Sequence, residues 1–404
     1  METVTFQMIL EAHRNLKNII KETDFCYSES LSELTGGNVY LKLENLQQSG
    51  SFKIRGAYNK MVHLSEEEKA CGVVASSAGN HAQGVAISAS KLGIKSTIVM
   101  PKSAPFAKIN ATRKYGGEVV LNGEIYDQAY QKALEIQKET GAVFVHPFND
   151  PYVIAGQGTI GLELLKEQPD LDVVLVPIGG GGIASGVALA IKTMNPKIKV
   201  IGVQSESAPS MYESIQTGHI ESIHVDRTIA DGIAVGQPGD LTFPLIQKYV
   251  DEIMIVSETE ISKAFLLLLE TCNLVCEGAG AVTVAALLSK QLDLKDKKVG
   301  AILSGGNIDI NLIESIINHA MIETGRRTEI KVSLNHKPGE LSAFLDEISK
   351  ELGNIVVIRQ NRHKEGLSMY HLEVTVVVET MDAQHKERVI KKLLEVGYEI
   401  EYSN

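Results

Sequence analysis

The chain has 404 residues, of which 44% are hydrophobic and 22% charged, a composition that excludes disordered and fibrous proteins and allows two or three domains. Fifty acidic and 39 basic residues give a formal charge of −11, the wrong sign for a surface that binds nucleic acid or anionic lipid, so we expect a small-molecule partner. The first 20 residues do not resemble a signal peptide, and no stretch approaches the roughly 20 apolar residues of a membrane span, so we expect a soluble, cytoplasmic protein.

Short β-branched runs alternate with longer helical patterns between residues 37 and 307, which predicts a parallel sheet with crossover helices. The candidate strands are mostly continuous apolar runs, as expected for strands covered on both faces, and they span residues 38–44, 72–76, 96–100, 118–122, 142–146, 172–178, 199–204, 252–257 and 298–304. Because ligands of an open α/β sheet bind outside the carboxyl ends of its strands, the loops after these runs are the candidate sites.

The pattern changes at Thr328, where the order becomes strand, helix, strand, strand, helix, strand, with a turn at residues 337–339. This βαββαβ order predicts a small ferredoxin-like unit with its own core. We therefore expect a first region at residues 1–325, containing two α/β subdomains of which the smaller covers about residues 50–150, and a second region at residues 326–404.

The first chemically suggestive loop reads Ser-Ser-Ala-Gly-Asn-His and covers residues 76–81, between a strand and a helix. Small residues followed by a helix N-terminus offer free backbone N–H groups and a favourable dipole, which suit an anion such as a carboxylate. An ordinary strand-to-helix turn would look similar.

The second loop consists of four consecutive glycines, residues 179–182, between a strand and a helix. A run of glycines is entropically costly, and its expected use is a nest of N–H groups wrapped around a phosphate. Gly179, Gly181 and Ala184 also satisfy G-x-G-x-x-A, and Glu206 ends the next strand, so a dinucleotide site is a rival interpretation. No G-K-[ST] follows the glycines, which argues against a nucleoside triphosphatase.

Two single residues, Ser304 and Lys53, are further candidates in the first region. Ser304 begins a Ser-Gly-Gly-Asn loop and offers a neutral hydroxyl that can donate or accept a hydrogen bond. Lys53 follows a polar loop at the head of a helix, where partial desolvation would lower its proton affinity and make its amine a usable nucleophile or base. A surface lysine at a helix start is the simpler alternative.

These four motifs together resemble the threonine/serine dehydratases of the tryptophan-synthase-β-like (fold type II) pyridoxal-phosphate enzymes, over about residues 5–325. The resemblance implies that Lys53 holds pyridoxal 5'-phosphate as a Schiff base. It further implies that Phe52 packs close to the ring, Asn80 bonds the 3-hydroxyl and Ser304 bonds the pyridine nitrogen. The remaining implied roles are phosphate binding by Gly179, Gly180, Gly181 and Gly182, and binding of the substrate carboxylate by Ser76, Ser77, Ala78 and Gly79.

By the same resemblance the reaction is α,β-elimination of water from L-threonine, giving 2-oxobutanoate and ammonia, with L-serine giving pyruvate. A neutral Ser304 favours elimination over transamination, because it cannot keep the ring nitrogen protonated as a carboxylate would. The related serine racemases carry a serine where this chain has Ala78, and the segment that holds their divalent cation contains here only Glu206 as an acidic residue. We therefore expect neither racemisation nor a metal ion.

The four cysteines are scattered and contain no CxxC pair, so we expect reduced, buried thiols rather than a disulfide framework or a zinc site.

The C-terminal unit resembles a single ACT regulatory domain, including the Lys337-Pro338-Gly339-Glu340-Leu341 turn. This resemblance implies an isoleucine or valine effector and a homodimer or homotetramer. A domain that only dimerises is the alternative.

The sequence favours a threonine dehydratase, with serine dehydratase as its near neighbour and serine racemase more remote. The alternatives are an NAD-type Rossmann oxidoreductase and a catalytically silent amino-acid-binding regulator. The oxidoreductase leaves Lys53, Asn80 and Ser304 without roles.

Overall fold

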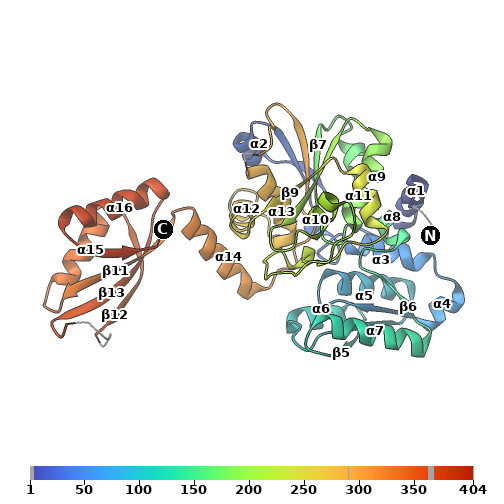
Figure 1. Ribbon diagram of the computed structural model, residues 1–404, viewed down its shortest axis with the longest axis horizontal. Coiled ribbons are helices and arrows are strands. Elements are labelled where there is room, and N and C mark those ends of the chain that lie inside the picture. The colour runs from blue at the N-terminus through green and yellow to red at the C-terminus, as the bar shows by residue number, and fades with distance from the viewer. Residues whose placement is uncertain (1–3, 290, 363–367, 404) are drawn as a thin grey trace. The chain divides into compact units, whose positions relative to one another are not determined.

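The computed structural model describes residues 4–289, 291–362 and 368–403. The chain divides into two compact units, Met1–Ile310 and Asn311–Asn404. Figure 1 shows both units and labels many of their elements, and each unit is described by itself below.

The first unit contains a six-stranded sheet with the order β1-β2-β10-β7-β8-β9. All neighbouring strands in it are parallel except β1, which runs antiparallel to β2. The strands are β1 (Phe25–Tyr27), β2 (Asn38–Lys42), β7 (Val173–Pro177), β8 (Lys199–Ser205), β9 (Glu252–Val256) and β10 (Lys298–Ile302). The five parallel strands match predicted runs, whereas the short edge strand β1 was not predicted.

A second, fully parallel sheet in the same unit has the order β5-β4-β3-β6 and lies within the predicted smaller subdomain. Its strands are β3 (Val73–Ser76), β4 (Ser96–Met100), β5 (Glu118–Leu121) and β6 (Val143–Phe144), all within predicted runs. In Figure 1 this sheet lies with the helices α5 (Asn80–Leu92), α6 (Phe106–Lys114) and α7 (Tyr126–Thr140). Its core is built from small and branched apolar side chains, among them Ala75, Val85 and Ile98.

The other helices of the first unit surround the larger sheet or join the two sheets. They are α1 (Phe6–Leu16), α2 (Glu29–Thr35), α3 (Lys53–Val62), α4 (Glu66–Cys71), α8 (Pro151–Glu167), α9 (Gly182–Met194), α10 (Ser210–Thr217), α11 (Thr242–Tyr249), α12 (Glu258–Thr271) and α13 (Gly278–Leu288). Short 3-10 turns cover Glu44–Leu46 and Asp231–Ile233.

Two local signals explain where α8 lies. Asp150 caps its N-terminus by accepting hydrogen bonds from the N–H groups of Tyr152 and Val153, and Pro151 occupies the first turn, where no N–H is needed. The helix also packs closely against α9, because a Cβ added to Gly186 would lie only 2.3 Å from the carbonyl oxygen of Ile154. Only glycine allows this approach of the two backbones.

The second unit confirms the predicted βαββαβ order. It contains α14 (Ile310–Glu323), β11 (Arg327–Asn335), α15 (Glu340–Lys350), β12 (Asn354–Asn361), β13 (His371–Glu379), α16 (Ala383–Val396) and β14 (Ile400–Tyr402). The sheet order β12-β13-β11-β14 is antiparallel throughout and encloses a core that includes Ile330, Phe344, Val376 and Val389. This is the strand order of the ferredoxin-like fold.

The division of the chain falls after the first residue of α14, between Ile310 and Asn311, whereas the predicted boundary follows that helix. The structure gives a physical reason, because the Arg327 guanidinium at the start of β11 donates a hydrogen bond to the Asn318 side chain on α14. The helix is thereby joined to the sheet of the second unit.

Two of the four cysteines are exposed, which makes the prediction of buried thiols wrong for them. Cys26 lies on the edge strand β1 and Cys71 at the last position of α4, where their side chains face solvent. Cys272 is partly buried and Cys276 fully buried. Within the described ranges no helix is long and apolar enough to cross a membrane.

Candidate active site

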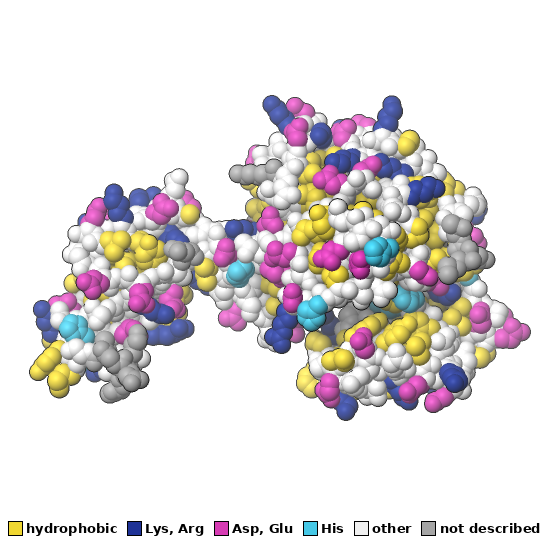
Figure 2. Space-filling model, viewed as in Figure 1, with side chains coloured by type: hydrophobic (Ala, Val, Ile, Leu, Met, Phe, Trp, Pro, Cys, Tyr) yellow, Lys and Arg dark blue, Asp and Glu magenta, His cyan; other side chains and the backbone are white. Residues whose placement is uncertain are grey.

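A cavity of about 1140 Å³ opens where the carboxyl-terminal ends of β3, β7 and β10 approach one another. Figure 2 shows the first unit hollowed on this face, with hydrophobic and histidine side chains around the opening. Every site residue predicted from the sequence lines this one cavity: Phe52, Lys53, Ser76, Ser77, Ala78, Gly79, Asn80, Gly179, Gly180, Gly181, Gly182 and Ser304. The tertiary structure therefore brings together four motifs that are up to about 250 residues apart in the sequence.

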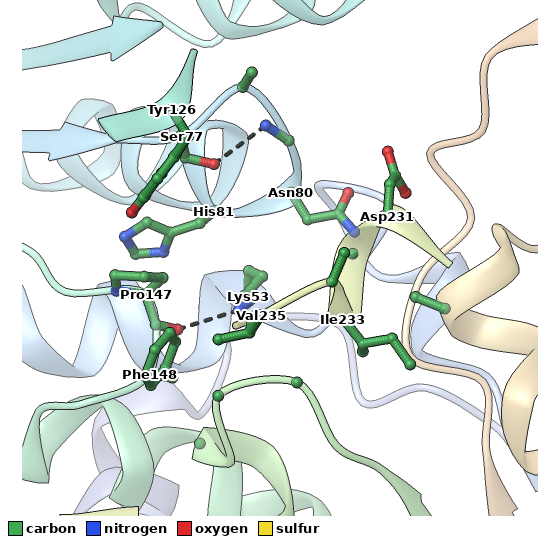
Figure 3. A pocket seen from close by; sticks show the side chains of 18 of the residues that line it. Lys53, Ser77, Asn80, His81, Tyr126, Pro147, Phe148, Asp231, Ile233 and Val235 are labelled. Carbon is green, nitrogen blue, oxygen red and sulfur yellow. Dashed lines mark hydrogen bonds between the residues drawn. The ribbon is translucent and has the colours of Figure 1, made fainter. Parts of the chain in front are cut away.

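Lys53 is the first residue of α3 and points into the cavity, as Figure 3 shows. Its Nζ donates a hydrogen bond to the carbonyl oxygen of Pro147 at 3.1 Å and lies 5.1 Å from the centroid of the Phe52 ring. Burial lowers the pKa of Lys53 to about 8, although the nearby Glu277 carboxylate opposes this shift. Near neutral pH the chain thus holds a lysine that can release its proton more readily than a solvated one.

The loop at residues 76–80 connects β3 to α5 at one wall of the cavity. The Ser77 hydroxyl accepts a hydrogen bond from the Gly79 N–H at 3.1 Å, which shapes the turn. The Ser76 hydroxyl is buried and has no hydrogen-bond partner within the described chain. A buried hydroxyl without a partner beside a helix N-terminus is a suitable contact for an anionic group.

The glycine loop lies between β7 and α9 and leaves no room for side chains. A Cβ on Gly180 would lie 2.4 Å from atoms of the Phe148 ring, and one on Gly182 would lie 2.8 Å from Phe148 Cβ. Gly181 has φ of 99°, in the left-handed region that favours glycine. The Thr242 hydroxyl donates to the Gly180 carbonyl at 2.6 Å and fixes the loop from outside.

None of the N–H groups of residues 179–182 donates to another group in the described part of the chain. Free N–H groups at the start of a helix, in a loop that only glycine can form, fit a phosphate group.

Ser304 follows β10, lines the cavity and is almost fully buried. Its hydroxyl donates to the carbonyl oxygen of Ala279 at 3.2 Å, and its oxygen lone pairs can accept a hydrogen bond from a ligand. If the hydroxyl rotates away from Ala279, it can donate to a ligand instead. The backbone carbonyl of Ser304 accepts from the Phe52 N–H at 3.2 Å and so joins this loop to the loop of Lys53.

Glu277 is a site residue that the sequence reasoning missed. It immediately precedes α13 and is 4% exposed, and its carboxylate accepts a hydrogen bond from Asn80 Nδ2 at 2.6 Å. Burial, reinforced by the charge of Asp231, raises the pKa of Glu277 to about 7. The sequence does contain a sign of this residue, because Glu277 is a single acidic residue directly before a helix made almost entirely of small and apolar residues.

Two histidines also line the cavity without having been assigned a role. His81 Nε2 hydrogen-bonds the Val145 carbonyl at 2.7 Å, and burial lowers the pKa of His81 to about 3. His146 Nδ1 accepts from the N–H of Asn149 at 2.8 Å, and burial lowers its pKa to about 4. Both rings are therefore neutral at physiological pH.

The segment at residues 231–237 also lines the cavity. Asp231 forms an ion pair with Lys108 of α6 at 2.9 Å, which connects this segment to the smaller sheet's layer of helices. Ile233 and Val235 contribute apolar surface on the same side as Lys53 in the view of Figure 3.

Comparisons with known proteins agree with this geometry. The family model described as "Pyridoxal-phosphate dependent enzyme" matches residues 16–305. An L-threonine ammonia-lyase of Thermotoga maritima is 53% identical over 98% of this chain and 99% of its own length. A catabolic L-threonine dehydratase of Escherichia coli K12 is 47% identical over 78% of this chain and 96% of its own length.

Two solved structures are similar to this chain at moderate sequence identity. The processed form of threonine deaminase isoform 2 from Solanum lycopersicum has a TM-score of 0.76 and 38% identity, covering 79% of this chain and 96% of that one. Maize serine racemase has a TM-score of 0.75 and 37% identity, and the match covers 79% of this chain and 98% of the racemase chain. With its cavity, its motifs and these similarities, the chain belongs to the family of pyridoxal-phosphate-dependent enzymes, of fold type II.

Proposed function

We propose that this protein is a pyridoxal-phosphate-dependent threonine ammonia-lyase, which converts L-threonine to 2-oxobutanoate and ammonia and also converts L-serine to pyruvate. The observation that carries the proposal is that Lys53, the glycine loop, the loop at residues 76–80 and Ser304 line one cavity. The relatives named as L-threonine ammonia-lyase or dehydratase, at 47–53% identity, support the same reaction.

The chemical groups that line the cavity fit pyridoxal phosphate. Gly179 to Gly182 would hold its phosphate through their free N–H groups, and Lys53 would bind it covalently through Nζ. Phe52, Asn80 and Ser304 would contact its ring, its 3-hydroxyl and its ring nitrogen. When bound, pyridoxal phosphate supplies an electron sink for the negative charge that develops when an amino acid loses its α-proton.

The chain's own groups would then bind the substrate and move its proton. The substrate carboxylate would lie against the loop at residues 76–79, where the buried Ser76 hydroxyl has no hydrogen-bond partner among the described residues. Lys53 Nζ, with its lowered pKa, would accept the α-proton. The neutral histidines and Phe148 would exclude bulk water from the reacting atoms.

The alternatives fit the site less well. Racemisation needs an acid on the opposite face of the substrate, and at the position where racemases carry a serine hydroxyl this chain has Ala78. A nicotinamide oxidoreductase would explain the glycine loop but not the buried lysine, Asn80 or Ser304. A silent regulator would not need a lysine whose pKa is lowered to about 8.

The test is release of 2-oxo acid by the purified full-length protein with added pyridoxal phosphate, measured for L-threonine and L-serine side by side. We expect a higher kcat/KM for threonine, with only modest discrimination because the substrates differ by one methyl group. If a yellow protein released no 2-oxo acid from either substrate, the elimination would be rejected and the cofactor retained.

For the second unit we propose the role of an ACT-like regulatory domain that binds isoleucine or valine in a cytoplasmic homodimer or homotetramer. Its ferredoxin-like sheet and the turn at Gly339, whose φ of 93° suits glycine, support this role. Light scattering would give the oligomeric state, and the rate of threonine turnover would be followed while isoleucine or valine is added. If neither amino acid bound to the full chain in calorimetry, the unit would have only a structural or dimerising role.

We also propose that the reaction needs no divalent cation. Glu206, the lone acidic residue of the segment compared with the racemase cation site, accepts a hydrogen bond from the N–H of Glu258 at 3.3 Å. Across the residues that the structure describes, no group of three or more His, Cys, Asp or Glu side chains is arranged to hold a metal ion.

A further inference from the structure

Asn307 connects three of the four motif loops, although neither the sequence nor the proposed reaction gave it a role. Its Nδ2 donates to the carbonyl oxygen of Ser49 at 2.7 Å and to Oδ1 of Asn80 at 2.8 Å. Ser49 begins the loop that leads to Lys53, and Asn307 itself ends the loop that begins at Ser304. The loop at residues 304–307 (the serine loop) thus contacts both Asn80 and the loop at residues 49–53 (the lysine loop) through one carboxamide.

The close fit around Asn307 is shown by Gly50. A Cβ on Gly50 would lie 2.2 Å from Asn307 Oδ1, and Gly50 has φ of 73°. The Gly50 carbonyl also accepts a hydrogen bond from the Gly306 N–H at 2.8 Å. The two loops are therefore held together by the Asn307 side chain and by the backbone of the residue before it.

The other end of the Asn80 carboxamide is held by Glu277, because Asn80 Nδ2 donates to Glu277 Oε1 at 2.6 Å. Glu277 is itself fixed: its N–H donates to the Gly305 carbonyl at 3.0 Å, and a Cβ on Gly305 would lie 2.4 Å from its Oε1. The carboxylate therefore has little freedom to turn away from Asn80.

These contacts allow the Asn80 amide only one orientation. If the amide were flipped, its oxygen would face the Glu277 carboxylate and its NH₂ group would face the NH₂ group of Asn307, and both contacts would be repulsive. In the observed orientation Asn80 Nδ2 donates to Glu277 alone among the described residues, so its second hydrogen is left for a ligand. In Figure 3 the amide nitrogen of Asn80 is the end turned toward Ile233 and Lys53.

We infer that Asn307 and Glu277 are positioning residues that hold Asn80 so that it presents an N–H donor to an oxygen of the bound cofactor. The inference rests on the proposed function, which places the 3-hydroxyl of pyridoxal phosphate beside Asn80. An N–H donor favours the ionised form of the oxygen that accepts from it. A carboxamide free to flip would present its own oxygen for part of the time and weaken this preference.

The test measures the affinity of the apoprotein for pyridoxal phosphate and the visible absorption spectrum of the complex. In Asn307→Ala we expect the dissociation constant to rise about tenfold, the effect of one lost hydrogen bond in a buried network. We also expect a changed visible spectrum, because the protonation of the 3-hydroxyl changes. A double-mutant cycle with Asn80→Ala separates this action from a general loosening: in the Asn80→Ala background, Asn307→Ala should change the affinity by less than about twofold.

Two variants test the other end of the chain of hydrogen bonds independently. Glu277→Gln keeps an acceptor oxygen for Asn80 Nδ2 and should retain the wild-type spectrum, whereas Glu277→Met removes the acceptor and should reproduce the change seen in Asn307→Ala. They also keep the test decisive if Asn307→Ala does not fold.

Asn59 provides a matched control on the helix of Lys53. It is 1% exposed, donates to the Tyr152 carbonyl at 2.8 Å and accepts from Asn15 at 3.2 Å, yet does not line the cavity. Asn59→Ala loses a comparable pair of buried hydrogen bonds and should leave the cofactor's affinity and spectrum unchanged.

Equal effects of Asn307→Ala in the wild-type and Asn80→Ala backgrounds would overturn the inference, as would a wild-type spectrum in Glu277→Met. Turnover by the wild-type protein decides the proposed function separately. If wild-type protein binds pyridoxal phosphate but releases no 2-oxo acid from threonine, the proposed function fails while the spectra of the variants still decide the role of Asn307 and Glu277.

Discussion

Four charged side chains are buried together beneath the site, and neutralising one of them should strongly destabilise the first unit. Arg55, two residues after Lys53, donates to Glu44 through Nε and Nη2, both at 2.8 Å, and to Glu163 through Nη1 at 2.5 Å. Lys42 lies 2.7 Å from Glu163. All four are nearly inaccessible to solvent, and their two positive and two negative charges balance.

The perturbation is Glu44→Gln, which keeps the size of the side chain but removes one negative charge. It leaves a net positive charge in the interior and turns an amide NH₂ group toward the donors of Arg55. Removing one partner of a buried ion pair typically destabilises a protein by about 3–5 kcal/mol, and we expect a loss in this range.

The assay is urea unfolding followed by far-UV circular dichroism, because the chain contains no tryptophan for fluorescence. The control is Glu135→Gln, which breaks the exposed pair of Lys132 and Glu135 at 2.9 Å and should change the free energy of unfolding by less than about 0.5 kcal/mol. The double variant Glu44→Leu with Arg55→Met removes one charge of each sign and leaves the pair of Lys42 and Glu163 intact. It should therefore be more stable than Glu44→Gln.

A loss below about 1 kcal/mol in Glu44→Gln would contradict this prediction, because it would mean that the four buried charges behave like a solvated surface pair. The same conclusion would follow if the double variant were the less stable of the two, since charge balance would then not be what the interior requires.

Lys53→Ala should abolish the yellow colour and lower 2-oxo acid release more than about a thousandfold, measured by absorbance and a coupled assay, and residual turnover near wild type would contradict its role. Because burial lowers the pKa of Lys53 to about 8, and only the neutral amine reacts, the rate of cofactor uptake by the apoprotein should rise with pH through about 8 and then level off; a flat stopped-flow profile between pH 6.5 and 9.5 would count against it. Gly180→Ala places a Cβ 2.4 Å from the Phe148 ring, so the resulting strain of about 1–3 kcal/mol should weaken cofactor binding in calorimetry, and an unchanged affinity would argue against phosphate binding there. Dialysis against EDTA should leave turnover unchanged, whereas a loss restored by Mg²⁺ would show a metal requirement.

The elements of the parallel sheets were predictable because their signals are local. Each run such as residues 173–177 is continuous in apolar residues, here mostly valine, as expected for a strand that is covered on both faces. The short edge strand β1 escaped prediction because only its first residue is buried and it owes its conformation to pairing with β2. Exposure of Cys26 follows from the same edge position.

The residues of the site also fall into those with a local signal in the sequence and those without one. Lys53, the glycine run and Ser304 stand out in the sequence because a helix start, a loop without side chains and a strand end are written in neighbouring residues. Glu277 and Asn307 did not acquire roles, because each acts on Asn80 across about 200 residues of chain. Nothing in the residues next to them shows that contact.

The order of most strands and helices, the ferredoxin-like pattern of the second unit and the motifs of the pyridoxal-phosphate family can all be recognised in the amino-acid sequence. The packing of distant segments, by contrast, buries Arg55, Glu44, Glu163 and Lys42 together. It also places hydrogen-bond partners at both ends of the Asn80 carboxamide. The physical reason is that hydrophobic periodicity and turn residues act over a few positions, whereas burial, charge pairing and pKa shifts depend on which distant segments pack together.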